Sequence, residues 1–201
     1  MTQKTRTPMR IIGGTDRGKH LVGPSDQSIR PTPGLVREAL FNILQEVIEG
    51  SHFLDLYAGN GAVGLEALSR GAASVTFVES SQAAVRLIRA NLAKFSRQGD
   101  AYIRTTSAPG QCRVFQRDQR EFDLIFLDPP YNLPGMPINL LEPILAPNGL
   151  VIHQRPFKKG VGDPFKGTTL ERLDLRKYGK TELSFWGFPD RSGDFAGDDD
   201  D

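Results

Sequence analysis

Apolar residues recur along the chain in two alternating spacings, one typical of strands and one typical of helices. The short apolar runs predict strands at residues 52–57, 74–79, 102–106, 122–128 and 150–154. Apolar residues three or four apart predict helices at residues 35–48, 62–70, 82–95, 111–116 and 136–145. Because the strands are apolar on both faces, we expect a mostly parallel sheet covered by helices on both sides.

Two further segments alternate polar and apolar residues and predict hairpins. Residues 168–178 and 181–188 flank Gly179 and should form an antiparallel hairpin that closes one edge of the sheet. Residues 10–22 should form a small hairpin near the N-terminus. We therefore divide the chain into a disordered start (1–9), an N-terminal hairpin and helix (10–50), one α/β domain (51–188) and a disordered acidic tail (189–201).

Composition narrows the function classes. A chain of 201 residues can bury a sizeable core without disulfides or metals. Cys112 is the only cysteine, and His20, His52 and His153 lack metal-ligand spacing, so we expect no metal site. No apolar run approaches the length of a membrane span, and the first ten residues lack a signal sequence. We expect a cytoplasmic monomer that does not bind membranes.

The net charge of +1 hides an uneven distribution. Residues 190–201 carry six aspartates and one arginine, which leaves 24 basic and 18 acidic residues in the rest of the chain. A basic body is compatible with a polyanionic partner such as nucleic acid.

A glycine loop connects the first predicted core strand to the next helix. Gly59, Gly61 and Gly64 match G-x-G-x-x-G, and Glu79 ends the following strand, where its carboxylate can accept hydrogen bonds from ribose hydroxyls. This pattern fits NAD and S-adenosylmethionine. Asp55, near the end of the strand, would repel a pyrophosphate but attract an ammonium group, which favours S-adenosylmethionine. An NAD oxidoreductase and a turn without a ligand remain alternatives.

The tetrapeptide Asp128-Pro129-Pro130-Tyr131 directly follows a buried strand, at the edge where open α/β sheets bind ligands. The prolines have no N–H, and an ionised Asp128 only accepts hydrogen bonds, so acceptors dominate this turn. Such a turn suits a planar ring with an exocyclic amine, held by Asp128 and a backbone carbonyl and stacked on Tyr131. A methyl donor and an amine would meet at this edge, and Asp128 could receive the amine proton.

At these residues the sequence resembles the class I S-adenosylmethionine-dependent methyltransferases. Within that class, it closely resembles the RsmD-type 16S rRNA (guanine-N(2))-methyltransferases. The stretches that carry the resemblance are residues 10–14 with 17–18, 30–44, 53–79, 122–131 and 178–181. The family's fold is a Rossmann-like, seven-stranded, mostly parallel sheet with an antiparallel C-terminal hairpin.

The resemblance implies methylation of the 2-amino group of one guanine of 16S rRNA, in the small ribosomal subunit or its assembly intermediate. The implied cofactor contacts are Asp55, Tyr57, Gly59, Gly61, Glu79, Ser80, Ser107, Ala108 and Asp128. The implied catalytic group is Asp128, Pro129, Pro130 and Tyr131. The candidate RNA-binding residues are Arg10, Arg17, Lys19, Arg30 and Arg37.

Three stretches depart from the family pattern. Thr106-Ser107-Ala108 stands where relatives usually have an aspartate for the adenine amine, so Ser107 or the backbone must substitute. The segment after Tyr131 is short and contains proline, and the fifth strand ends in His153-Gln154-Arg155, where relatives often carry a glutamate. The alternatives are an N(6)-adenine methyltransferase acting on DNA or RNA and a non-catalytic RNA-binding module.

Overall fold

The computed structural model describes residues 9–23, 32–130, 136, 138–157 and 164–191. These residues form one seven-stranded sheet with the strand order β3-β2-β1-β4-β5-β7-β6. The strands are β1 (His52–Leu56), β2 (Ser74–Val78), β3 (Ala101–Arg104), β4 (Phe122–Leu127), β5 (Leu145–Pro156), β6 (Glu171–Tyr178) and β7 (Thr181–Gly187). The first five run parallel, whereas β7 is antiparallel to β5 and β6, which confirms the predicted sheet and its C-terminal hairpin.

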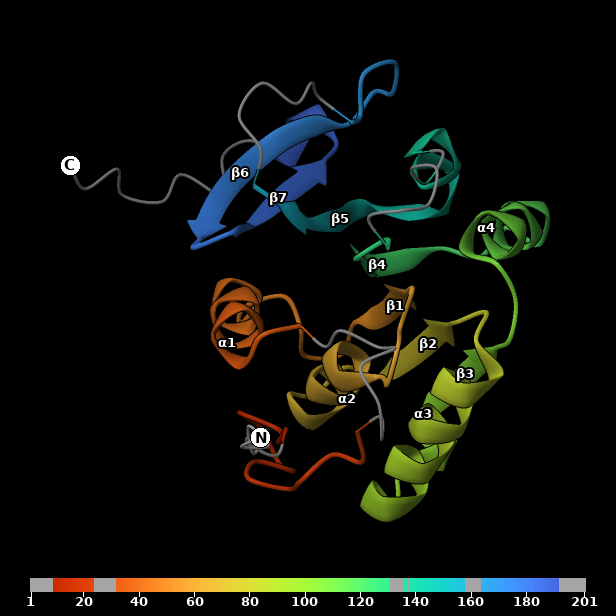
Figure 1. The fold of residues 1–201 in the computed structure, drawn as a ribbon. Coiled ribbons are helices and arrows are strands. Elements are labelled where there is room, and N and C mark those ends of the chain that lie inside the picture. The colour runs from red at the N-terminus through yellow and green to blue at the C-terminus, as the bar shows by residue number, and fades with distance from the viewer. Residues whose placement is uncertain (1–8, 24–31, 131–135, 137, 158–163, 192–201) are drawn as a thin grey trace, which may run out of the picture.

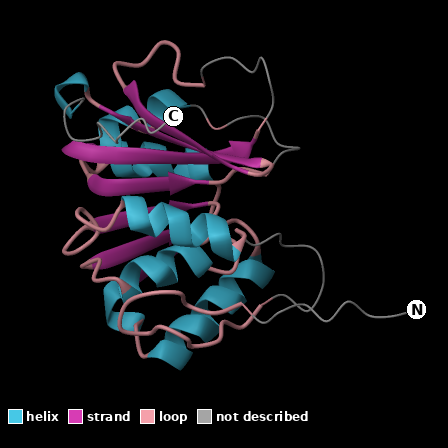
Figure 2. Ribbon diagram, turned by 90° about the vertical axis from the view of Figure 1, so that its left-hand side faces the viewer, coloured by secondary structure: helices cyan, strands magenta, loops and turns pink. Residues whose placement is uncertain are grey.

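Helices cover both faces of the sheet, as its apolar strands require (Figures 1 and 2). One face carries α1 (Gly34–Ile43), α2 (Ala62–Ser69) and α3 (Gln82–Phe95). The other face carries α4 (Ala108–Arg117) and the short 3₁₀ turns η2 (Ile138–Leu140) and η3 (Glu142–Ile144). Two more 3₁₀ turns, η1 (Gln98–Asp100) and η4 (Pro189–Arg191), lie at the surface ends of other elements.

Two of the predicted elements differ from the observed ones. The helix expected at residues 136–145 is wrong within its described part, which forms η2 and η3 instead. Pro143 explains the break, because it has no N–H to donate to the carbonyl four residues earlier. The hairpin expected at residues 10–22 forms without regular strands: Arg10 and His20 form an antiparallel bridge, and the N–H groups of Ile11 and Leu21 donate to the carbonyls of Lys19 and Met9.

Aromatic contacts occur on both faces of the sheet. Phe41 of α1 stacks on Phe53 of β1 with ring centroids 6.3 Å apart. On the opposite face, Phe165 stacks on Trp186 of β7 at 4.3 Å. The third glycine of the loop sets the fit of α2 on β2, because a Cβ at Gly64 would lie 2.3 Å from the ring of Phe77. Gly64 is therefore required for helix–sheet packing.

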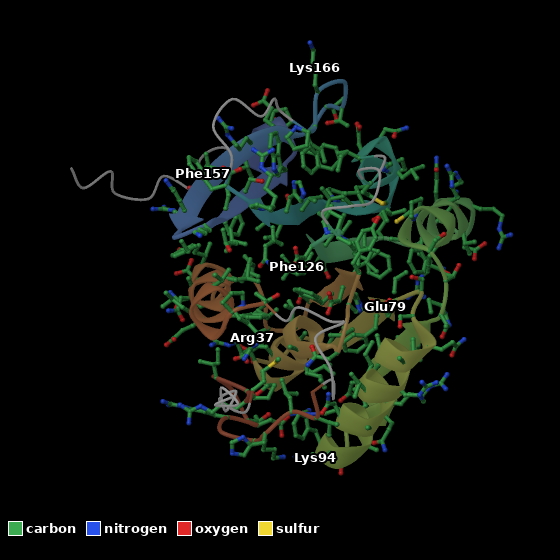
Figure 3. The ribbon with its side chains drawn as sticks, viewed as in Figure 1. Arg37, Glu79, Lys94, Phe126, Phe157 and Lys166 are labelled. Atoms are coloured by element: carbon green, nitrogen blue, oxygen red, sulfur yellow. The ribbon has the colours of Figure 1, made fainter. Side chains whose placement is uncertain are left out.

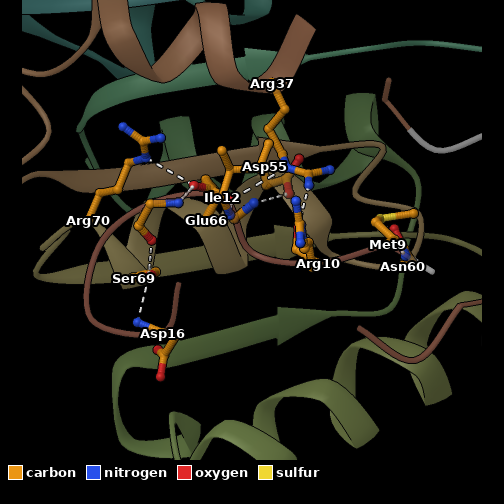
Figure 4. A network of polar contacts seen from close by, with 12 residues as sticks. Met9, Arg10, Ile12, Asp16, Arg37, Asp55, Asn60, Glu66, Ser69 and Arg70 are labelled. Atoms are coloured by element: carbon orange, nitrogen blue, oxygen red, sulfur yellow. Dashed lines mark hydrogen bonds and ion pairs between the residues drawn. The ribbon is translucent and has the colours of Figure 1, made fainter. Parts of the chain in front are cut away.

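One buried carboxylate helps to hold the N-terminal segment. Glu66 of α2 accepts hydrogen bonds from the backbone N–H groups of Ile12 (2.9 Å) and Gly13 (2.7 Å). Its oxygens also lie 3.4 Å from Arg37 Nε and 3.0 Å from Arg70 Nε (Figure 4). The Glu66 side chain is 0% exposed. It thus joins the N-terminal segment, α1 and α2 in one polar network.

We expect Glu66→Gln to lower the free energy of unfolding by about 3–5 kcal/mol, because removing one partner of a buried ion pair leaves charge uncompensated. An amide would also direct one N–H₂ group at donors. Denaturant unfolding monitored by circular dichroism measures the change. Glu38→Gln, on the exposed face of α1, is the matched control and should leave stability nearly unchanged. Equal stabilities of the two variants would contradict the role of Glu66.

Candidate active site

The parallel strands bring four side chains to one edge of the sheet. Strand pairing sets Leu56 beside Val78 and Leu127, and Leu127 beside His153. The residues that follow in neighbouring strands therefore share this edge. They are Tyr57, Glu79, Asp128 and Gln154. This carboxyl-terminal edge is where open α/β sheets bind ligands.

The glycine loop uses backbone conformations that favour glycine. Gly59 and Gly61 have φ values of 56° and 80°, and the N–H of Gly61 donates to the carbonyl of Ala58 at 2.8 Å. Tyr57 also has a positive φ of 60°, an uncommon conformation for a residue with a side chain. The turn brings the backbone of β1 into α2 within a few residues. Gly59 is partly exposed and has no side chain to keep a ligand away. Gly61 is buried instead, and a Cβ there would lie 3.2 Å from Ile88 Cγ1 and 3.3 Å from the ring of Phe77, so its role is in packing.

Glu79 links the glycine loop to the next helix. It follows the last residue of β2 (Figure 3). Its carboxylate accepts hydrogen bonds from the N–H of Gly59 (2.9 Å) and of Ser81 (2.8 Å). A carboxylate has about four lone-pair sites, so Glu79 can still accept hydrogen bonds from ribose hydroxyls. The neighbouring Ser80 is exposed at the same edge.

Asp55 is 1% exposed, and its Oδ2 accepts a hydrogen bond from the N–H of Gly64 at 2.9 Å. The sequence analysis did not predict this hydrogen bond between β1 and α2. Burial raises the pKa of Asp55 to about 7; the Gly64 hydrogen bond opposes the rise, and the charges of Glu79 and Asp128 add to it. Three acidic side chains therefore act on one another at this edge, and a cationic ligand would relieve their repulsion.

The third parallel strand leads into α4, whose first residues were predicted to contact the cofactor. Ser107 caps the helix, and its Oγ accepts a 3.4 Å hydrogen bond from the N–H of Gly110. Ser107 is exposed, whereas Ala108 is buried. Ser107 can thus offer a hydroxyl to a ligand while Ala108 packs in the core.

Tyr57, which follows β1 at the same edge, is half-buried, and its hydroxyl donates a hydrogen bond to Met136 Sδ at 3.7 Å.

Asp128 follows β4, is partly exposed, and accepts a 2.6 Å hydrogen bond from Nε2 of Gln154 on β5. Pro129 is partly exposed and Pro130 is exposed, whereas Tyr131 lies outside the described residues. Sequence reasoning noted Gln154 only as a departure from the family pattern and missed its contact with Asp128. The available signal was that both residues end neighbouring parallel strands.

The prediction that Arg37 binds RNA is wrong. Arg37 is 1% exposed, lies between α1 and α2, and donates from Nη2 to the carbonyl of Arg10 at 2.6 Å (Figures 3 and 4). Its position on α1 falls on the same face as Val36, Leu40 and Phe41, which pack into the core. Glu66 supplies the charge that makes this burial tolerable.

The other candidate RNA-binding residues have different environments. Arg10 and Arg17 are exposed, and Lys19 is exposed but forms a 2.6 Å ion pair with Asp16. Arg30 lies outside the described residues. The predicted disorder at residues 1–9 and 189–201 also falls mostly outside them and stays a prediction, as does the domain division.

The described part of the chain contains neither a cluster of metal-ligating side chains nor a candidate membrane-spanning helix. Among residues 9–23, 32–130, 136, 138–157 and 164–191, no three His, Cys, Asp or Glu side chains cluster as metal ligands. None of the described helices is long and apolar enough to cross a bilayer.

The raised pKa of Asp55 makes stability depend on pH. A carboxyl whose pKa is about 7 when folded and near 4 when unfolded stabilises the protein below about pH 4, and this contribution is lost as pH rises through 7. We therefore expect Asp55→Asn to stabilise the ligand-free protein at pH 8, by up to about 4 kcal/mol, and to have little effect at pH 4. Denaturation at both pH values measures this.

Asp190→Asn, at an exposed position, serves as the control and should behave like the unchanged protein at both pH values. A pH-independent effect of Asp55→Asn would show that the carboxyl does not change its charge in this range.

Comparisons with known proteins are consistent with this architecture. The family described as "Conserved hypothetical protein 95" matches residues 9–187. The "Ribosomal RNA small subunit methyltransferase D" of Escherichia coli strain K12 is 40% identical over 157 residues, covering 76% of this chain and 77% of the relative.

Solved structures share the fold. That of yhhF from Escherichia coli aligns with a TM-score of 0.76 at 32% identity, over 90% of this chain and 97% of the other. The structure of SMU.776, described as complexed with SAH, aligns with a TM-score of 0.65 at 17% identity, over 77% of this chain and 50% of the other. At this low identity, the similarity is evidence for the fold alone. With its strand order and C-terminal hairpin, the chain has the class I methyltransferase fold and belongs to the family described as "Conserved hypothetical protein 95".

Proposed function

We propose that this protein transfers a methyl group from S-adenosylmethionine to the exocyclic 2-amino group of one guanine in 16S rRNA. The rRNA would be part of the small ribosomal subunit or its assembly intermediate, so the protein would act in the cytoplasm. The observation that carries the proposal is the shared sheet edge, where the glycine loop with Glu79 lies beside the acceptor group at Asp128. The name of the Escherichia coli relative supports the substrate.

The acidic edge fits a cationic methyl donor better than a dinucleotide. Neither Asp55 nor Glu79 forms an ion pair with a basic side chain in the described part of the chain. An ammonium and a sulfonium group would supply the missing positive charge, whereas a pyrophosphate would add repulsion. S-adenosylmethionine supplies a methyl group that is activated for displacement by its bond to the sulfonium sulfur.

The acceptors at Asp128 can hold the nucleophile. The Asp128 carboxylate and the backbone carbonyl of Pro129 can each accept one hydrogen bond from the –NH₂ group of the substrate. These two hydrogen bonds would direct the nitrogen lone pair at the methyl carbon. The N–C bond forms as the C–S bond breaks, and the electron pair of the broken bond stays on sulfur. The nitrogen becomes cationic, is stabilised by the negative charge of Asp128, and passes its proton to that carboxylate or to water.

Transfer of a labelled methyl group to small ribosomal subunits that lack their guanine methylation tests this proposal. Nucleoside mass spectrometry should find one new N(2)-methylguanosine, and duplex DNA should remain unlabelled. N(6)-methyladenosine in RNA or methylated DNA would instead identify the adenine methyltransferase. No transfer to any nucleic acid, with retained RNA binding, would favour a non-catalytic module.

We expect Asp128→Asn to lower kcat by about a hundredfold or more, because it removes the charge that stabilises the developing cation and accepts its proton. Cofactor affinity, measured by titration calorimetry, should change by less than about threefold. Asp123→Asn is the matched control, because Asp123 lies near the start of β4, at the edge of the sheet opposite to Asp128. Near-normal turnover of Asp128→Asn would refute the assigned role.

A further inference from the structure

Gln154 is a buried polar residue to which no role has yet been assigned. It lies near the end of β5, is 3% exposed, and donates from Nε2 to Oδ2 of Asp128 at 2.6 Å. The pairing of Leu127 with His153 sets the two residues side by side on neighbouring parallel strands. The contact therefore follows from the register of the sheet.

The chemistry of the contact determines how the amide is oriented. Only the nitrogen end of the amide can donate, and its carbonyl end would repel an ionised carboxylate. In this orientation Oε1 is buried and has no hydrogen-bond partner among the described residues. A buried acceptor without a partner is unfavourable, so general packing does not explain the orientation. The hydrogen bond to Asp128 does.

The charged groups around the pair explain why an uncharged donor suits this position. Asp55 on β1 and Glu79 after β2 are acidic, and the charges of Glu79 and Asp128 both act on Asp55. Arg155 is paired with Glu182 of β7 at 2.6 Å. The ring of His153 lies against Phe165 on the other face, and burial lowers its pKa to about 4, so that it is neutral. Gln154 thus adds a donor to this edge without adding charge.

We propose that Gln154 is a positioning residue for methyl transfer, whose side-chain N–H holds the Asp128 carboxylate in the orientation that accepts the substrate amine. This inference rests on the proposed function. A cation at residue 154 would offset the negative charge that stabilises the methylated nitrogen, and a carboxylate would repel Asp128. An amide avoids both effects while it restricts the rotation of the Asp128 side chain.

Two substitutions of similar shape separate positioning from packing. Gln154→Met removes the donor at every pH and should lower kcat by about tenfold to a hundredfold, the usual effect of losing a hydrogen bond to a charged group. Gln154→Glu supplies a donor only when one proton is shared with Asp128. Its kcat should approach that of the unchanged enzyme near pH 6 and fall towards or below that of Gln154→Met near pH 8.5.

Cofactor affinity and the KM for ribosomal subunits should stay within about threefold in both variants, and thermal unfolding checks that they fold. Gln116→Met, exposed on α4, is the control and should match the unchanged enzyme. Normal kcat in Gln154→Met would overturn the proposal. Equal, pH-independent losses in both variants would also overturn it, because they would indicate a packing role.

A measurement independent of activity tests the contact itself. In ¹⁵N-resolved NMR spectra, the side-chain amide protons of Gln154 should exchange slowly with water and should shift and exchange faster in Asp128→Ala. Unchanged signals would overturn the proposal. If the unchanged protein methylates no ribosomal subunit, the proposed function fails, whereas the NMR result still reports whether Gln154 holds Asp128.

Discussion

The buried carboxylate of Glu66 is the interaction on which the arrangement of the helical layer depends. It receives two backbone N–H groups from the N-terminal segment and lies beside two guanidinium groups, all near the first turns after the glycine loop. Because α2 begins directly after Gly61, the position of this helix also determines where the glycine loop lies. A largely buried ion network thus fixes the backbone against which a ligand would bind.

The site combines this rigid support with unfavourable charge. Asp55, Glu79 and Asp128 lie at the ends of neighbouring strands, and burial, together with the repulsion from the other two carboxylates, raises the pKa of Asp55. Such an arrangement destabilises the ligand-free protein and favours a cationic ligand by the same interactions. Backbone N–H groups at Gly64, Gly59 and Ser81 and the amide of Gln154 hold the carboxylates in place without neutralising them.

Several errors of the sequence analysis have a common cause. Helical spacing on its own did not reveal that Arg37 faces the core, because a charged residue on that face is buried only when a partner such as Glu66 is supplied from another helix. The N-terminal segment forms an irregular hairpin, because the N–H groups of Ile12 and Gly13 bond to Glu66, more than fifty residues away. Neither contact is visible in local periodicity.

The sequence by itself determined the alternation of strands and helices, the C-terminal hairpin, the glycine loop and the Asp-Pro-Pro turn, because each depends on local spacing, on residues with restricted or unusual backbone freedom, or on both. Only the tertiary structure decided which polar groups meet: Glu66 with Arg37, Asp55 with Gly64, and Asp128 with Gln154. These contacts arise from strand register and helix packing, which bring together residues far apart in the chain.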